Sequence, residues 1–400
     1  MLKKSDKKMI KHSSVYGLYL FIMLLPFEYL LAQFSIGSVL KYIGIMTMGL
    51  SVLDIIMVYN MKIKLNYRTI IILLWIVYVF FSTIWAVDDN LFKYFASIYI
   101  NNALMFLLIS VLQFTESEKK LLKNAFLVGV AFLVLYMTFV PGAVVYSSWQ
   151  HRLTMAAIDG SELIDQNYLS ALLLIPFALA FSDLIEKKNK PIIKIGFIVY
   201  CVAIIYYIVA TGSRSGVIAA CFIAACVLQK NAKKHAFALI VVIGVSIMLL
   251  PLLTENMSMK MLERFTLKAM TGQTSESDDR LVIWQIAIQS LNNMVRALVG
   301  YGAGSAEKIV GLSYYKDASV HNFFLAHMVE FGFTGSLLLF SMLFRIAKDL
   351  KNYRYFDYLV GFLGIMIMGI FLDLLTTKFF WTALMMATVC ISGKKERMVN

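Results

Sequence analysis

Long unbroken runs of apolar residues constrain this 400-residue chain more than any other feature. An α-helix needs roughly 20 residues to cross the hydrocarbon core of a bilayer, and the runs approach that length. A transmembrane β-barrel would instead show short segments of alternating polarity. The runs predict about 12 membrane-spanning helices, at 14–33, 38–59, 69–87, 94–113, 124–142, 167–185, 193–211, 215–229, 236–253, 320–344, 356–375 and 378–393.

The composition supports the same class of protein. Hydrophobic residues make up 60% of the chain and charged residues 15%, and the mean hydropathy is +0.76. A net charge of +13 would point to nucleic acid in a soluble protein. In a chain of membrane helices it reflects basic cytoplasmic loops, so no nucleic-acid partner is expected. We therefore predict an all-α polytopic integral membrane protein, with residues 1–400 in a single membrane domain.

The distribution of lysine and arginine predicts the orientation of the chain. Cytoplasmic loops of membrane proteins are enriched in both residue types. Basic clusters occupy the N-terminal segment and alternate connections after it, so both termini are expected to be cytoplasmic. The first apolar run is interpreted as an uncleaved span, because it is long and lacks a small-residue cleavage site. The clusters lie at 3–11, 62–68, 119–123, 187–194, 230–234, 345–354 and 394–397.

One connection, 254–319, is far longer than the typical loop of about five residues. Its place in the alternation predicts a large extracytoplasmic loop within the membrane domain. Apolar and basic residues alternate along 257–270, which is typical of a short amphipathic helix lying on the membrane surface. After a polar stretch, 280–300 predicts a second helix that ends at Gly300.

The four cysteines lie inside apolar runs and lack the paired spacing of a disulfide framework or a metal site. They are predicted to be small packing residues. They are Cys201, Cys221, Cys226 and Cys390.

Five motifs, together with Trp381, resemble the family of O-antigen ligases and surface-polysaccharide polymerases. They occur in the family's order and span roughly residues 165–335. The motifs are DQNYLSALLLIPFALA (165–180), TGSRSG (211–216), DRLVIWQ (279–285), GYGAG (300–304) and HNFFLAHMVEFGFTG (321–335). The resemblance implies a helical membrane glycosyltransferase that acts outside the cytoplasm on a polyprenyl-diphosphate-linked oligosaccharide, without nucleotide sugar, cofactor or metal. The partners expected are that lipid-linked donor, a glycan acceptor and membrane lipids, with a chain-length regulator and a flippase as candidate protein partners.

Such a reaction must stabilise a lipid diphosphate as it leaves, and arginine suits this task because its planar fork binds phosphate oxygens bidentately. The candidates in the predicted outer segments are Arg152, Arg214, Arg280 and Arg296. Arg214 lies between Gly212 and Gly216 in a turn at a helix start, where backbone N–H groups would add to an anion site. Two other interpretations stay open: Arg214 could extend to the membrane interface, and Arg280 could pair with a neighbouring aspartate.

His321 opens a long apolar run directly after the polar segment, and an ionisable residue at the mouth of a membrane helix calls for a reason. We predict that His321 is the general base for the acceptor hydroxyl, because the dipole at a helix start disfavours the charged imidazolium. Asn322 is a candidate to hold that hydroxyl. A polar helix-start residue satisfied by backbone groups stays the alternative for His321. His327 faces another side of the helix and is expected to pack.

Other polar residues are weaker candidates. Asp165, Gln166 and Asn167 stand where they can cap a helix, but capping explains one such residue better than three, so Asn167 or Asp165 is a candidate to position sugar. Ser213, beside Arg214, is a further candidate for substrate binding. Structural roles are expected for the acidic residues Glu28 and Asp373.

Glycines in the motifs are predicted to serve the fold. GYGAG (300–304) is similar to a phosphate loop, but nucleotide is scarce outside the cytoplasm, so a turn is predicted. Gly332 and Gly335 are expected to allow close helix packing.

The favoured function is polymerisation of lipid-linked repeat units into O-antigen, capsule or exopolysaccharide at the outer face of the bacterial cytoplasmic membrane. A ligase that transfers finished glycan to another acceptor carries the same motifs, so it stays an alternative. A transporter or flippase for the lipid-linked glycan is the other alternative. In a transporter, polar residues should line a path through the membrane midplane, whereas here they gather at the predicted outer ends.

Overall fold

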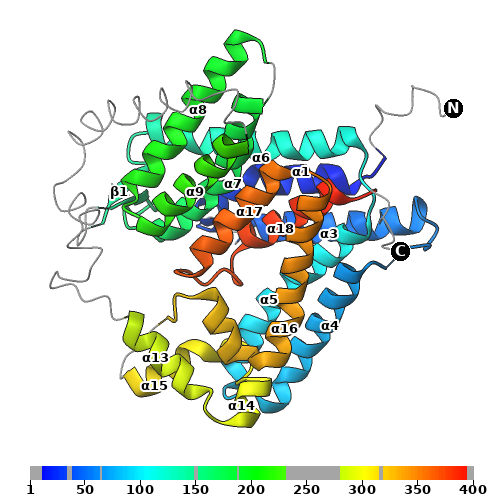
Figure 1. The fold of residues 1–400 in the computed structure, drawn as a ribbon, viewed down its shortest axis with the longest axis vertical. Coiled ribbons are helices and arrows are strands. Elements are labelled where there is room, and N and C mark those ends of the chain that lie inside the picture. The colour runs from blue at the N-terminus through cyan, green and yellow to red at the C-terminus, as the bar shows by residue number, and fades with distance from the viewer. Residues whose placement is uncertain are drawn as a thin grey trace.

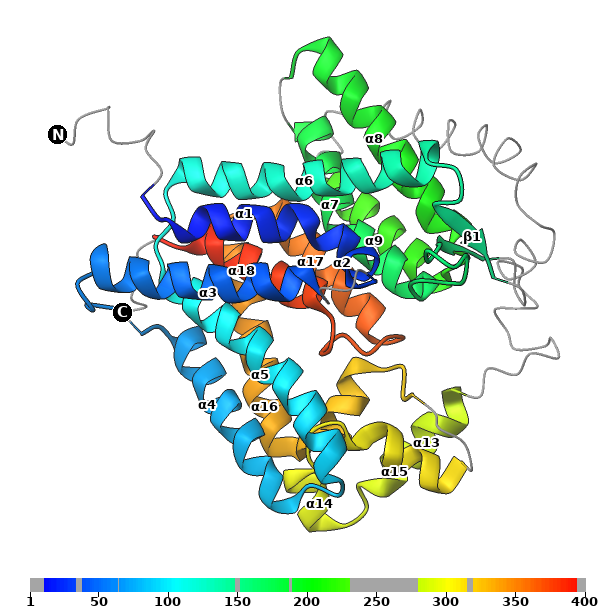
Figure 2. The ribbon, with the colours of Figure 1, turned by 180° about the vertical axis from the view of Figure 1, so that it is seen from behind.

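The computed structural model describes residues 11–33, 38–63, 65–147, 152–186, 189–230, 280–314 and 319–393. Helices dominate these ranges, and the named strands among them form one short antiparallel hairpin, β1–β2 (Figure 1 and Figure 2). In chain order the elements are α1 (Ser14–Leu24), η1 (Leu25–Phe27), α2 (Glu28–Ala32), α3 (Val39–Met57), α4 (Tyr67–Phe81), η2 (Ser82–Trp85), α5 (Asp89–Val111), α6 (Glu116–Phe139), β1 (Val144–Tyr146), β2 (Leu153–Met155), α7 (Gln166–Glu186), α8 (Pro191–Ala210), α9 (Arg214–Lys230), α13 (Arg280–Ser290), α14 (Met294–Val299), α15 (Ser305–Tyr314), α16 (Phe323–Asn352), α17 (Phe356–Gly369) and α18 (Lys378–Ile391).

Eight helical segments in the described ranges are long and apolar enough to cross a membrane, and α17 and α18 are shorter apolar helices. The predicted class, an all-α polytopic membrane protein, is therefore confirmed. The predicted number of spans stays a prediction, because the apolar run at 236–253 lies outside the described residues. The predicted surface helix at 257–270 lies outside them as well.

Helix α7 lies at the centre of the bundle. Within its most apolar window 89% of the residues are buried, against 22% for α8 at the edge. Helices α8, α9 and α17 all pack against α7, as Figure 1 shows. Gly361 lets α17 approach closely, because a Cβ at this position would lie 3.1 Å from the Cβ of Ala178. The residues at the start of α7 are therefore held by the most buried helix of the molecule.

Helix α16 is a hairpin of two arms. At Gly332 the backbone leaves the helical region, with φ +61° and ψ −167°. The rings of Phe323 and Phe340 then lie 5.9 Å apart, whereas a straight helix would separate them by about 25 Å along its axis. His327 Nδ1 and Ser336 Oγ, also on opposite arms, are 2.9 Å apart. The helix predicted as one continuous span at 320–344 is therefore divided at Gly332. The arm before Gly332 is short, and the arm after it extends to Asn352.

The loop 300–304 docks against the bend of this hairpin. The N–H groups of Tyr301 and Gly302 donate to the carbonyl oxygens of Val329 and Glu330, at 3.0 and 2.8 Å. These carbonyls end the short arm and lack helical partners beyond the bend. Gly300 has a φ of +75°, and a Cβ on it would lie 2.3 Å from the Glu330 carbonyl oxygen. The prediction that this motif is a turn is confirmed.

The two glycines predicted to allow close packing do so at the same bend. A Cβ on Gly332 would lie 2.5 Å from the carbonyl carbon and oxygen of Leu298. A Cβ on Gly335 would lie 2.5 Å from the Cβ of Phe331 and 2.7 Å from the ring of Tyr78. Both positions therefore require glycine for packing, as predicted.

The described part of the predicted long loop, 280–314, forms three short helices, α13, α14 and α15. The single helix predicted at 280–300 is broken, because the Asn293 side chain accepts hydrogen bonds from the N–H groups of Val295 and Arg296 and starts a new helix there. The end of that helix at Gly300 is as predicted. That the loop is extracytoplasmic stays a prediction.

The first and last described segments meet at the same end of α6. The N–H of His12 donates to Glu118 Oε1 at 2.8 Å. The Lys119 ammonium donates to the Ser392 carbonyl oxygen at 2.9 Å. Both ends of the described chain therefore lie at the same end of α6, and the cytoplasmic location of the termini stays a prediction.

Candidate functional site

Arg152 joins two of the sequence motifs. It stands directly before β2, and its side chain is held between two helix ends: Nε donates to the Thr211 carbonyl oxygen at 2.7 Å, and Nη2 donates to Asn167 Oδ1 at 2.9 Å. The residue is 7% exposed. The guanidinium therefore links the end of α8 to the start of α7, and it supports the neighbouring turn.

The turn 211–216 begins α9 at Arg214, as the glycine-flanked motif predicted. Ser213 Oγ accepts a hydrogen bond from the N–H of Gly216 at 3.2 Å, so this hydroxyl caps the first turn of α9. Gly216 itself touches α7, because a Cβ there would lie 1.8 Å from Ser170 Oγ. Arg214 is partly exposed at this helix start. The motif thus fixes an arginine at the positive end of a helix dipole.

The two candidates at the start of α7 have different tasks. Asp165 Oδ1 accepts from the N–H of Asn167 at 2.8 Å and from that of Tyr168 at 3.4 Å, so Asp165 caps the helix. Asn167 uses its side-chain oxygen for Arg152. The hydroxyl of Tyr168 donates to the Asp373 carbonyl oxygen at 3.0 Å, which connects this helix start to the segment 370–377.

The segment 370–377, which joins α17 to α18, contacts elements that carry candidate residues. It extends from the bundle toward α13 (Figure 1). From the side of α13, the ring of Trp284 lies 6.4 Å from the ring of Phe371. Trp284 also donates its indole N–H to the Val320 carbonyl oxygen at 3.0 Å. The start of α7 and helix α13 therefore both reach this connection, and α13 also contacts the residue before His321.

His321 lies just before the short arm of α16. Asn322 is the N-cap of this arm, because its side-chain oxygen accepts from the N–H of Leu325 at 3.0 Å. His321 has a φ of +48°, a conformation that non-glycine residues seldom adopt and that often marks a functional position. Its side chain is partly exposed.

Arg280 and Arg296 have different surroundings, although the sequence predicted that both could bind the diphosphate. Arg280 is the first residue of α13, one helical turn before Trp284, whose indole contacts the residue before His321. Arg296 Nη1 donates to the carbonyl oxygens of Trp85 and Gly300, at 3.2 Å each, and the guanidinium lies 4.7 Å from the Tyr301 ring. Arg296 therefore ties α14 to the connection between α4 and α5, a role in the fold that its sequence position did not reveal.

Asp373 adds an ionisable group to the segment 370–377. Burial raises the pKa of its carboxyl to about 6; the hydrogen bond from the Leu375 N–H lowers it, and the charge of Glu307 raises it. The pKa of this carboxyl therefore lies above the ordinary value for aspartate. The sequence pointed only to a structural role. Lys378, its neighbour in sequence, pairs instead with Glu28.

Within the described ranges, no three His, Cys, Asp or Glu side chains are arranged to hold a metal ion. The four cysteines carry free thiols. Cys201 and Cys390 are buried among apolar neighbours, as predicted for packing residues, whereas Cys221 is exposed.

His327 is a packing residue, as predicted. It is 1% exposed. The indole N–H of Trp75 donates to its Nε2 at 3.1 Å, so Nδ1 carries the proton and faces Ser336 Oγ at 2.9 Å. One ring nitrogen therefore binds α4 and the other binds the second arm of α16.

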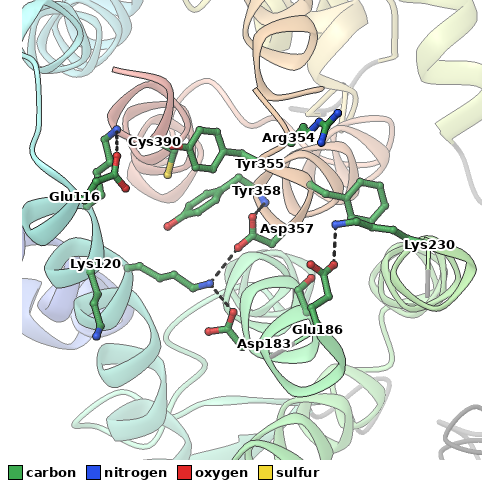
Figure 3. Close-up of a pocket in the computed structure, with 14 residues that line it drawn as sticks. Glu116, Lys120, Asp183, Glu186, Lys230, Arg354, Tyr355, Asp357, Tyr358 and Cys390 are labelled. Atoms are coloured by element: carbon green, nitrogen blue, oxygen red, sulfur yellow. Dashed lines mark hydrogen bonds and ion pairs between the residues drawn. The ribbon is translucent and has the colours of Figure 1, made fainter. Parts of the chain in front are cut away.

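A pocket of about 290 Å³ lies at the opposite ends of α7 and α9, roughly 30 Å along α7 from Asn167. The Lys123 ammonium lies between two carboxylates, Asp183 at 2.9 Å and Asp357 at 3.0 Å. Figure 3 labels both aspartates in this pocket. Lys230 pairs with Glu186 at 2.8 Å. These ammonium groups are already neutralised, so the pocket serves to join the ends of α6, α7, α9 and the start of α17.

These features define a polytopic helical membrane protein in which polar and basic residues gather around one interhelical connection. Residues 199–340 match the model of a protein family described as O-antigen ligase. The match contains Arg214, Arg280 and His321, and it confirms the resemblance drawn from the motifs. A comparison with the curated proteins found no match. The match to this family indicates a membrane enzyme that transfers glycans.

Proposed function

We propose that this protein is a glycosyltransferase that polymerises polyprenyl-diphosphate-linked oligosaccharide repeat units into a surface polysaccharide. The reaction takes place at the outer face of the bacterial cytoplasmic membrane. The observation that carries the proposal is a set of contacts around segment 370–377. The α7 start, which Arg152 ties to the turn bearing Arg214, contacts this segment through Tyr168. Trp284 of α13 contacts both the segment and the residue before His321.

The arginines supply the charge that the donor requires. When the glycosidic bond to the lipid diphosphate breaks, negative charge grows on the leaving oxygens, and fixed cations stabilise it most when no reorganisation is needed. Arg214 places a guanidinium at the positive end of the α9 dipole. Arg280 stands at the start of α13 and provides a second fork. Arg152 supports the site indirectly, because its N–H groups already donate to the Thr211 carbonyl oxygen and to Asn167 Oδ1.

His321 supplies the base that the acceptor requires. A sugar hydroxyl becomes nucleophilic when a neutral imidazole accepts its proton during attack. His321 precedes the start of an α-helix, and the helix dipole there favours the neutral ring. Asp373, whose carboxyl has a pKa of about 6, is a further group that can accept hydrogen bonds from sugar hydroxyls. No metal or cofactor enters this scheme.

The test is a reconstituted reaction with purified protein and lipid-diphosphate-linked repeat units as the sole glycan. Released lipid diphosphate and the length of the glycan product are followed separately. A polymerase should release one lipid diphosphate for each repeat unit added and give a ladder of products. A ligase should release it only when a different acceptor is supplied, and a transporter should move intact donor without release. Either of these outcomes would replace the proposal.

A further inference from the structure

Trp284 on α13 reaches the chain segment that carries His321. Its indole N–H donates to the Val320 carbonyl oxygen at 3.0 Å. Val320 immediately precedes His321 and is 2% exposed, within an apolar cluster that includes Ile283 and Ala287 of α13. The hydrogen bond therefore holds the peptide group that leads into His321.

The backbone of His321 needs such support. Its φ of +48° is uncommon for a residue with a side chain, and conformations of this kind persist only when their surroundings enforce them. On the far side, Asn322 is fixed as the cap of α16 through the N–H of Leu325. The contact from Trp284 and this cap thus restrain the chain directly before and directly after the imidazole.

The same side chain reaches the rest of the site. The Trp284 ring lies 6.4 Å from the ring of Phe371 in segment 370–377. Trp284 also follows Arg280 by one helical turn. The Trp284 side chain thereby contacts both the residue before His321 and segment 370–377, and it lies one turn along α13 from Arg280.

We propose that Trp284 is a positioning residue for glycosyl transfer, which acts by holding the Val320 carbonyl so that His321 faces the acceptor hydroxyl. This inference rests on the proposed function, in which His321 is the base. Trp284 is not proposed to touch the donor. Its N–H therefore affects the transfer step and not donor binding, so its loss lowers kcat and leaves KM for the donor unchanged.

The variant Trp284→Phe keeps an aromatic ring against Phe371 and removes the N–H donor. One hydrogen bond is worth about tenfold in rate, so kcat should fall about tenfold at unchanged KM. Trp85→Phe is the matched control, because the Trp85 indole donates to a backbone carbonyl as well, that of Val299 at 3.1 Å, beside the α4–α5 connection. This control should keep wild-type kcat. An equal loss in both variants, or no loss in Trp284→Phe, overturns the positioning role.

A double-mutant cycle shows whether Trp284 acts through His321. In a His321→Asn background, Trp284→Phe should cause no further loss, because the group that it positions is gone. An additional tenfold loss there overturns the proposal. If His321→Asn retains wild-type turnover, His321 is not the base, and the positioning role of Trp284 fails with it. If His321→Asn is inactive while Trp284→Phe is fully active, only the positioning role fails.

Folding of each variant is followed by thermal unfolding in detergent. Should Trp284→Phe not fold, Trp284→Tyr replaces it, since tyrosine keeps a ring and offers a hydroxyl donor in a different position. Lower kcat at unchanged KM in this variant supports the proposal, and a raised KM for the donor overturns it.

Discussion

Phe323 and Phe340 are in ring contact, with centroids 5.9 Å apart, although 17 positions separate them in the sequence. The contact exists because Gly332 turns α16 back along itself. The turn also sets the distance of His321 from the bend, which is about 14 Å along the short arm. At that level Phe323 meets Phe380 near the start of α18, with centroids 5.3 Å apart. The candidate base is therefore placed beside the α17–α18 connection by the hairpin, and not at the outer tip of a membrane-spanning helix.

Gly332→Ala should destabilise the protein by on the order of 3 kcal/mol. The added Cβ would lie 2.5 Å from the Leu298 backbone, and the φ of +61° is strained for alanine. Thermal unfolding in detergent measures the effect. Gly49→Ala on α3 is the control, because nothing lies within 4 Å of a Cβ there, and it should be neutral or slightly stabilising. Equal behaviour of the two variants would contradict the hairpin.

The sequence predicted the helices and their class because continuous apolar runs have few other stable outcomes in a membrane. It did not predict the hairpin, because a single glycine interrupts an otherwise uniform apolar run and its φ is decided by packing against Leu298. Helix caps followed the expected chemistry: Asp165 caps α7 and Asn322 caps α16.

The candidate site could be predicted only in part, because side-chain partners are a tertiary property. Arg280 and Arg296 lie in the same stretch of sequence with similar neighbours. Only the folded chain separates them, since Arg296 is committed to the carbonyl oxygens of Trp85 and Gly300. Asp373 lies near the end of the apolar run predicted at 356–375, and nothing in the sequence shows that Tyr168 and Trp284 reach this part of the chain from distant elements.

The orientation can be tested with cysteines at two exposed positions, Lys62 and Asp89, on successive connections. Asp89→Cys should react with a membrane-impermeant thiol reagent added to intact cells, and Lys62→Cys should react only after the cells are opened. The background carries Cys221→Ser, because this native cysteine is exposed. The reverse labelling pattern would move the proposed site to the cytoplasmic side.

Asp373→Asn should raise the unfolding temperature more at pH 8 than at pH 5. The folded-state pKa of about 6 lies above the ordinary value of 3.8. The folded protein therefore keeps this proton between roughly pH 4 and pH 6, and ionisation makes folding less favourable as pH rises through that window. Asparagine stays neutral and can still accept the Leu375 N–H. An equal gain in unfolding temperature at both pH values, or a loss at pH 8, would show that folding does not raise the pKa of the Asp373 carboxyl.

Arg214→Lys should lose most of the turnover while the protein still inserts into the membrane, because lysine keeps the charge but not the bidentate fork. Arg354→Lys is the matched control, since Arg354 is exposed at the turn between α16 and α17, and it should remain fully active. Turnover of the wild type should also survive treatment with a chelator. Near-normal activity of Arg214→Lys, or abolition by the chelator, would refute diphosphate binding by arginine without metal.

His321→Asn should lower the rate of transfer by about 10²–10⁴-fold, the range expected when a general base is removed. Asparagine is chosen because it tolerates the left-handed backbone that His321 adopts, so the loss is not caused by added strain. The measurement is the rate of lipid diphosphate release from purified protein, with donor binding assayed in parallel. Donor binding should be unchanged, which places His321 in the transfer step.

His327→Ala is the control for that loss, because His327 is bound to Trp75 and Ser336 inside the hairpin. It should lower the unfolding temperature and leave the turnover of the folded fraction close to wild type. The rate with His321 intact should fall at low pH as the imidazole gains a proton. That fall should persist in Asp373→Asn, which removes the carboxyl that titrates near pH 6. Wild-type turnover of His321→Asn would leave His321 as a residue that only leads into α16, and another base would have to be sought around segment 370–377.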